Sequence, residues 1–212
     1  AETPPIPGLA EAGHLDNVSA MALERLPQSL IVIGSGFIAV ELGQMFARLG
    51  VAVTILARTN RMLSREDPEI GVALAGYLQA EGVDVRTETT VERVDRGGRY
   101  RVQVSRDGQT EVLEADQLLV AAGRRARTMG FGLDTVGVAL GRKGAIVVDD
   151  HLETSVSGVY AAGDVAGEPM FVYVAAYGGA LAAENALRGN TRRLDLTAVP
   201  SVTFSDPAVA SV

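Results

Sequence analysis

Apolar positions between residues 30 and 56 follow the order strand, helix, strand. Residues 30–33 (LIVI) form a continuous apolar run, which is typical of a strand buried on both faces. Between Phe37 and Leu49 the apolar residues recur at helical spacing, and Gly50 supplies a C-terminal stop. Residues 51–56 repeat the apolar, β-branched pattern of a buried strand. This order predicts a βαβ unit of about 30 residues.

The following segment changes from helical to alternating periodicity. Residues 67–81 predict a helix with Asp as N-cap and Pro at its first position, and residues 83–86 predict a third strand. Across residues 88–114 apolar and polar side chains alternate, and the pairs at 97–98 (GG) and 107–108 (DG) suit tight hairpin turns. The pattern predicts a three-stranded antiparallel meander inserted in the α/β unit.

The remainder of the chain is less regular. Residues 118–121 return to the pattern of a buried strand. Short apolar runs predict strands at 146–148, 159–161 and 202–204, and a helix rich in small residues is predicted at 171–187.

Composition and charge exclude several classes of protein. Asp and Glu outnumber Lys and Arg by 26 to 19, a formal charge of −7, which argues against nucleic acid as a main partner. A hydrophobic content of 47% excludes a disordered chain. No uncharged stretch exceeds 15 residues, the length of residues 169–183, which is shorter than the ~20 residues of a membrane span; the first residues also lack a leader pattern. We therefore expect a cytoplasmic protein without membrane contact.

The chain contains no cysteine, so it cannot itself form a disulfide or a thiolate site. It begins with Ala1 rather than Met, and residues 4–8 (PPIPG) resemble an extended linker. Residues 207–212 form an apolar run without a closing turn. We expect an internal piece of a longer protein; frayed ends of a complete domain are the alternative.

A dinucleotide-binding motif lies at the first predicted strand-to-helix turn. Residues 34–39 (GSGFIA) match Gly-x-Gly-x-x-Ala. In this motif Gly34 allows the tight turn, Gly36 lets the backbone approach a pyrophosphate, and Ala39 keeps helix and strand close. The helix N-terminus then donates N–H groups to phosphate. The motif predicts nucleotide binding; a glycine turn needed only for packing is the alternative.

The residues after the second strand indicate which nucleotide is bound. NAD sites usually place an acidic residue about 20 residues after the motif, on the ribose 2′-hydroxyl. Here no acidic residue occurs before Glu66, and Arg58, Arg61 and Arg65 occupy the segment instead. A guanidinium can hold a 2′-phosphate through charge-assisted hydrogen bonds. The cluster favours NADP(H) over NAD(H), with Arg58 as the strongest candidate; a solvated arginine cluster is the alternative.

Five segments together resemble the FAD-dependent pyridine nucleotide–disulfide oxidoreductases. They are residues 4–8, 26–34, 36–41, 122–124 and 154–164, and the last (TSVSGVYAAGD) resembles that family's flavin motif. The resemblance covers essentially the whole chain. The segments that resemble the mercuric reductase branch most are 56–58, 65–68, 79–82, 171–176, 194–200 and 204–207.

The resemblance implies FAD as a second cofactor. Asp164 would accept hydrogen bonds from the ribityl hydroxyls, and Gly163 would allow their close approach. Val172 and Tyr173 would lie at the start of the helix beneath the flavin ring, where the helix dipole favours negative charge. A turn aspartate and an ordinary core helix are the alternatives.

Four further positions match the family with less specific consequences. Phe37 occupies the place where some relatives carry a tyrosine over the nicotinamide pocket, and a core aromatic is the alternative. Glu41 matches a glutamate that pairs with a lysine in the preceding half of relatives. Gly123 and Arg124 match a Gly-Arg turn after the last nucleotide-domain strand, although the residues that follow depart from the family pattern.

The predicted fold class is α/β: a Rossmann-like dinucleotide-binding domain with an inserted antiparallel meander, plus an incomplete second half of an FAD domain. Residues 1–25 would be linker and the end of a preceding FAD-domain portion, and residues 26–124 the NADPH-binding domain. Residues 125–200 would be the second FAD-binding part, and residues 201–212 the start of a dimerisation domain.

In that family a redox-active cysteine pair precedes this region. The resemblance therefore implies a portion of a homodimeric oxidoreductase that passes hydride from NADPH to FAD and electrons on to a disulfide or Hg(II). By itself the portion should bind nucleotide without turning over substrate. Two alternatives are a non-catalytic NADP-binding module and a flavin-dependent reductase without redox cysteines.

Overall fold

The computed structural model describes all 212 residues. The chain divides into two compact units: Ala1–Gly123 together with Pro200–Val212, and Arg124–Val199. The predicted α/β class is confirmed. No helix is both long enough and apolar enough to cross a membrane.

A four-stranded parallel sheet forms the centre of the first unit. Its strands are β1 (Ser29–Ile33), β2 (Ala52–Leu56), β3 (Asp84–Arg86) and β7 (Gln117–Val120). They lie in the order β3-β2-β1-β7, which is the order of one half of a doubly wound nucleotide-binding sheet. The register pairs Ile33 with both Leu56 and Val120, so β1, β2 and β7 end at one edge.

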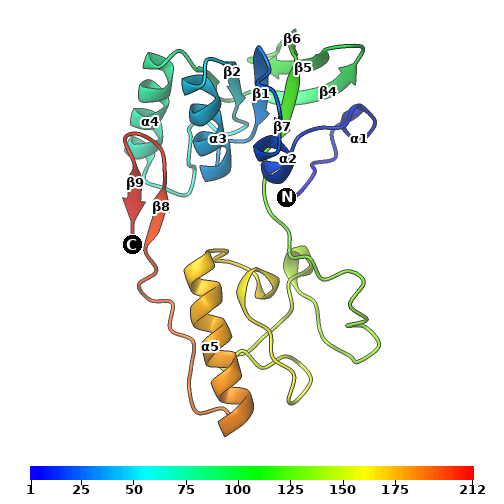
Figure 1. Cartoon of the computed structure of the whole chain (residues 1–212), viewed down its shortest axis with the longest axis vertical. Helices are drawn as coiled ribbons and strands as arrows, with labels where there is room; N and C mark the ends of the chain where they lie inside the picture. The colour runs from blue at the N-terminus through cyan, green and yellow to red at the C-terminus, as the bar shows by residue number, and fades with distance from the viewer. The chain divides into compact units, whose positions relative to one another are not determined.

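The two faces of this sheet are covered by different layers (Figure 1). Helices α3 (Phe37–Arg48) and α4 (Pro68–Ala80) cover one face, where they pack on Leu30 and Val32 of β1. Ile31 and Ile33, which alternate with them, point to the other face. Every apolar residue of the predicted run 30–33 is therefore buried, as expected for a strand between two layers.

The second layer is the antiparallel meander. Its strands are β4 (Thr90–Arg96), β5 (Tyr100–Arg106) and β6 (Gln109–Ala115), in sequence order. Asp107 and Gly108 both have positive φ, 51° and 76°, which is the conformation of a tight hairpin turn. Val94, Val102 and Val104 are fully buried against the parallel sheet. The predicted meander is present.

The first 25 residues, expected as linker and the end of a preceding FAD-domain portion, lie within the first unit. Two short helices occur there: α1 (Leu9–Ala12) and α2 (Asn17–Met21). Leu9 is fully buried in the meander layer, and the N–H of Val94 donates to the carbonyl of Pro7 at 2.9 Å. Gly8 has φ 78°, and a Cβ there would lie 2.0 Å from the Val94 carbonyl oxygen. Burial of one leucine and close backbone contact attach this segment to β4.

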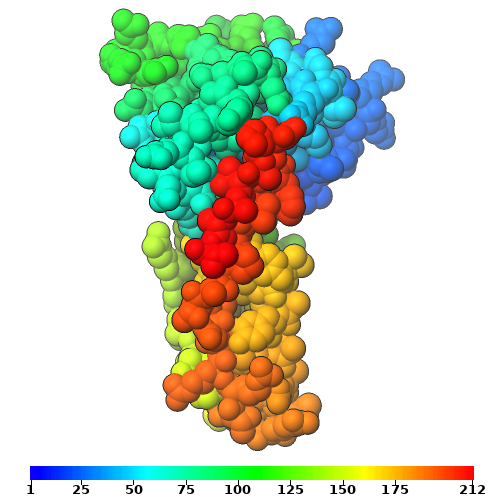
Figure 2. Space-filling model, turned by 90° about the vertical axis from the view of Figure 1, so that its left-hand side faces the viewer, coloured from blue at the N-terminus to red at the C-terminus, as the bar shows by residue number.

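The last residues also pack on the first unit. Strands β8 (Ser201–Thr203) and β9 (Val209–Ser211) form a hairpin, which Figure 2 shows in red on the surface of this unit. The buried side-chain amide of Gln44 on α3 forms two hydrogen bonds with the backbone of Asp206. Its nitrogen donates to the Asp206 carbonyl and its oxygen accepts from the Asp206 N–H, both at 2.8 Å. The hairpin is therefore held by hydrogen bonds to α3.

The second unit contains one long helix and mostly irregular chain. Its elements are η1 (Arg142–Gly144), η2 (Gly163–Ala166) and α5 (Val172–Arg188). The strands predicted at 146–148 and 159–161 are wrong, because those residues form only isolated bridges. The apolar runs are three residues long and pack in a small cluster around Ile146 and Ala161 instead of pairing in a ladder.

Candidate functional site

The loop between β1 and α3 contains two glycines with different constraints. Gly34 has φ 136°, and a Cβ there would lie 2.3 Å from the carbonyl oxygen of Ala121. Gly36, the N-cap of α3, has φ −83°, and a Cβ there would meet no atom within 4 Å. The fold requires Gly34 because the chain after β7 passes beside it, whereas the space beside Gly36 is open. That space lies at the N-terminus of a 12-residue helix, whose dipole favours an anion.

Two small residues bring α3 close to the sheet. Ala39 is fully buried, as the motif predicts. A Cβ at Gly43 would lie 2.9 Å from the Cδ1 atom of Ile55 on β2. Gly43 was missed in the sequence analysis, although its position four residues after Ala39 places both on one face of the helix.

The three candidate arginines differ in their surroundings. Arg58, two residues after the end of β2, is exposed and makes no hydrogen bond or ion pair. Arg61 is half-buried, and its Nη2 donates to the carbonyl of Ser64 at 3.1 Å. Arg65 is exposed on the same loop. Arg58 is therefore a free cation at the sheet edge where the glycine loop also begins.

Phe37 and Glu41 lie in the first two turns of α3. Phe37 is 39% exposed, so it is not a core aromatic. The carboxylate of Glu41 accepts the N–H of Phe204 at 2.8 Å. Glu41 thus contacts the loop that connects β8 and β9.

Gly123 and Arg124 mark the end of the first unit and the start of the second. Gly123 has φ 147°, and its carbonyl accepts the N–H of Glu2 at 2.9 Å. In the second unit, Nη2 of Arg124 lies 2.8 Å from Oδ2 of Asp164, and both side chains are partly exposed. The structure therefore joins the arginine of the predicted Gly-Arg turn and the predicted flavin aspartate in one ion pair.

The turn that carries Asp164 lies against the start of α5. Gly163 has φ 78°, and a Cβ there would lie 3.0 Å from the Cβ of Ala175. At the first turn of α5, Val172 is 84% exposed and Tyr173 is 43% exposed, with the Tyr173 ring stacked on that of Phe171 at 5.2 Å. The helix thus begins with apolar side chains in solvent next to the Gly-Asp turn.

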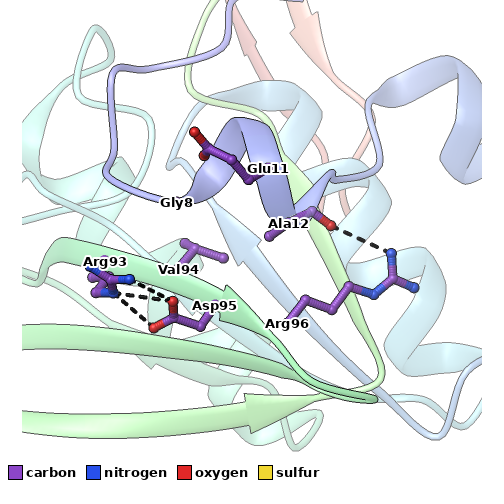
Figure 3. Close-up of a pocket in the computed structure, with 7 residues that line it drawn as sticks. All are labelled: Gly8, Glu11, Ala12, Arg93, Val94, Asp95 and Arg96. Carbon is purple, nitrogen blue, oxygen red and sulfur yellow. Dashed lines mark hydrogen bonds and ion pairs between the residues drawn. The ribbon is translucent and has the colours of Figure 1, made fainter.

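A shallow hollow of the first unit lies at the seam between α1 and β4 (Figure 3). Arg93 pairs with Asp95 at 2.9 Å. Arg96 donates to the carbonyl of Ala12, and its guanidinium lies 4.6 Å from the ring centroid of Tyr100. None of the predicted site residues lines it.

Comparison with known proteins gives a consistent picture. The sequence profile of a family described as "Pyridine nucleotide-disulphide oxidoreductase" matches residues 1–179. Mercuric reductase of Staphylococcus aureus is 45% identical over 210 residues, which are 99% of this chain and 38% of that enzyme. Mercuric reductase of Streptomyces lividans is 45% identical over 211 residues, 99% of this chain and 44% of that enzyme. The chain thus spans less than half the length of these relatives.

Solved structures resemble the whole chain. The HOCl-induced flavoprotein disulfide reductase RclA of Escherichia coli is 32% identical with a TM-score of 0.87, covering 99% of this chain and 48% of that one. LpdA of Mycobacterium tuberculosis is 33% identical with a TM-score of 0.79, covering 89% of this chain and 41% of that one.

Proposed function

The chain belongs to the pyridine nucleotide-disulphide oxidoreductase family, and we propose that it forms the NADPH-binding domain and part of the FAD-binding region of a flavoprotein oxidoreductase. The proposed parent activity passes hydride from NADPH to FAD and electrons on to a disulfide or to Hg(II). The mercury branch is favoured by the 45% identity to mercuric reductases over nearly the whole chain.

One juxtaposition supports NADPH as the nucleotide. The open space beside Gly36 and the free guanidinium of Arg58 follow neighbouring strands at the same edge of the sheet. The α3 N-terminus would receive the pyrophosphate, and Arg58 would receive the 2′-phosphate that distinguishes NADPH from NADH. One charge-assisted hydrogen bond is worth about 1.5–3 kcal/mol, which corresponds to roughly 10- to 150-fold in affinity.

The second unit fits part of an FAD site. Asp164 is a partly exposed carboxylate that can accept hydrogen bonds from sugar-like hydroxyls while Arg124 holds its other side. Val172 and Tyr173 present apolar surface to a flat ring at the N-terminus of a 17-residue helix. FAD, when bound, would supply the capacity to take up hydride; this chain would bind and orient it.

The sulfur chemistry must come from outside these 212 residues. A soft ion such as Hg(II) prefers thiolate ligands, and the chain has no cysteine. We therefore expect the chain to bind NADPH and to show no turnover of Hg(II) or of a disulfide when it is tested alone.

Calorimetric titration of the Arg58→Ala variant with NADPH and NADH tests the proposal. We expect NADPH affinity to fall about 10-fold or more, and NADH affinity to change by less than about twofold, because NADH has no 2′-phosphate. Arg106→Ala is the matched control: it removes another exposed arginine, in the meander, and should leave both affinities unchanged. An unchanged preference in Arg58→Ala would refute the proposed role of this arginine.

A further inference from the structure

Ser35, the variable residue inside the glycine motif, contacts the arginine loop (residues 58–65) through both its side chain and its backbone. Its carbonyl accepts the N–H of Leu63 at 2.8 Å. Its Oγ lies 3.2 Å from Oγ1 of Thr59. Residues 58–65, which carry the three arginines, are thereby bonded at two points to the loop that precedes α3.

The direction of these hydrogen bonds follows from proton counting. Oγ1 of Thr59 donates its only proton to the carbonyl of Arg61 at 2.8 Å, since a carbonyl can only accept. Ser35 must therefore be the donor in its contact with Thr59. The result is a chain of bonds from the Ser35 hydroxyl through the Thr59 hydroxyl to the backbone of Arg61.

The rest of the loop is shaped around this chain. Leu63 has φ 44°, an unfavourable backbone conformation for leucine. Its side chain is only 5% exposed, and the neighbouring Met62 is fully buried in the core. A Cβ at Gly71 of α4 would lie 2.2 Å from the Met62 carbonyl oxygen. Core burial and close contact with α4 hold Leu63 in the conformation that directs its N–H toward Ser35.

We propose that Ser35 and Thr59 are positioning residues that determine nucleotide specificity. They would fix the arginine loop (residues 58–65) relative to the glycine loop (residues 34–36), so that one rigid unit binds both the 2′-phosphate and the pyrophosphate. This inference rests on the proposed NADPH site. A flexible arginine must lose conformational freedom when it binds phosphate, and a loop already ordered by Ser35 and Thr59 reduces that loss. NADH uses only the glycine-loop side, so its binding does not depend on the connection.

The test removes the Thr59 hydroxyl while keeping the shape of the side chain. In the 212-residue chain, Thr59→Val deletes both hydrogen bonds of this hydroxyl, and Thr59→Ser retains a hydroxyl. Loss of one neutral hydrogen bond is worth roughly 2- to 12-fold, so we expect the ratio of NADH to NADPH dissociation constants to fall about fivefold in Thr59→Val. Ser35→Ala should lower this ratio by a similar or smaller factor.

The matched control is Thr54→Val, which removes a threonine hydroxyl from the middle of β2. Each variant is titrated calorimetrically with NADPH and NADH, and its urea midpoint is measured. Support requires a lower ratio in Thr59→Val and Ser35→Ala, a retained ratio in Thr59→Ser and Thr54→Val, and NADH affinity within about twofold of wild type.

Two other outcomes separate the two hypotheses. Equal losses of NADPH and NADH affinity in Thr59→Val, or no loss at all, would overturn the positioning role while Arg58→Ala still abolishes the preference. Equal affinity of the unmodified chain for both nucleotides would overturn the proposed NADPH site itself.

Discussion

The two glycines of the motif should respond in opposite ways to the addition of a methyl group. Gly34→Ala places Cβ 2.3 Å from a backbone carbonyl oxygen at φ 136°, whereas Gly36→Ala places it in open space at φ −83°. Gly34→Ala should therefore damage the fold, and Gly36→Ala should damage only ligand binding.

The magnitudes can be worked out from these contacts. At Gly34, positive-φ strain costs about 1–3 kcal/mol and overpacking against Ala121 adds about 1–3 kcal/mol, a large share of a typical total stability of about 5–15 kcal/mol. At Gly36, alanine is a poorer N-cap than glycine by up to about 1 kcal/mol, but it restricts the unfolded chain by about 0.4–1 kcal/mol. The two effects nearly cancel.

Ligand binding should change instead. The methyl group of Gly36→Ala occupies the space where the pyrophosphate would approach the α3 N-terminus. Loss of one charge-assisted hydrogen bond there weakens binding roughly 10- to 150-fold, and NADPH and NADH should suffer equally because both carry the pyrophosphate.

Urea unfolding and calorimetric titration measure the two effects. Gly76→Ala is the control: Gly76 is exposed in α4, and a Cβ there also meets no atom within 4 Å. This variant should bind both nucleotides like the unmodified chain. If Gly36→Ala also binds NADPH like the unmodified chain, the open space is not the phosphate site and the reasoning fails.

Two further predictions concern the attachment of the C-terminal hairpin to α3. Gln44→Ala removes three hydrogen bonds, two to the backbone of Asp206 and one to Glu81. It should therefore lower the unfolding free energy by about 2–4 kcal/mol and speed hydrogen exchange of the Asp206 amide. An unchanged exchange rate would contradict this prediction. A hydrogen bond from Arg48 lowers the pKa of Glu81 below its ordinary value of 4.5. The ionised Glu81 carboxylate therefore contributes its full stabilisation above pH 4.5, and this stabilisation is lost as the pH falls through the lowered pKa. Urea midpoints from about pH 5 to pH 3 should drop less in Glu81→Gln, and a parallel drop would contradict the assignment.

The parallel sheet, its two helices and the meander could be predicted from the sequence because their signals are local. The apolar runs at 30–33 and 51–56 contain strands buried between two layers. The Asp-Gly pair at 107–108 lies between two alternating segments, a combination that favours a tight hairpin turn. The position of the nucleotide loop follows from the same local pattern, since its glycines come between a buried run and a helix.

The contacts that connect distant segments were not predictable in this way. Gln44 forms hydrogen bonds with the backbone of Asp206, which lies 162 residues later in the chain, and nothing near Gln44 in the sequence signals that partner. The short helix α1 packs on the meander core through Leu9, a contact that the proline-rich start of the sequence does not signal. In the second unit, three-residue apolar runs suggest strands, but those residues form only isolated bridges and pack in a small apolar cluster instead.

The most direct test of the account is calorimetric titration of the 212-residue chain with NADPH and, separately, with NADH. We expect saturable binding of both, with NADPH bound at least about 10-fold more tightly, because the free guanidinium of Arg58 would bind the 2′-phosphate that NADH lacks. Equal affinities would contradict the assignment of Arg58 and the choice of NADPH. Absence of binding by either nucleotide would contradict the assignment of the glycine loop as a site that this chain forms on its own.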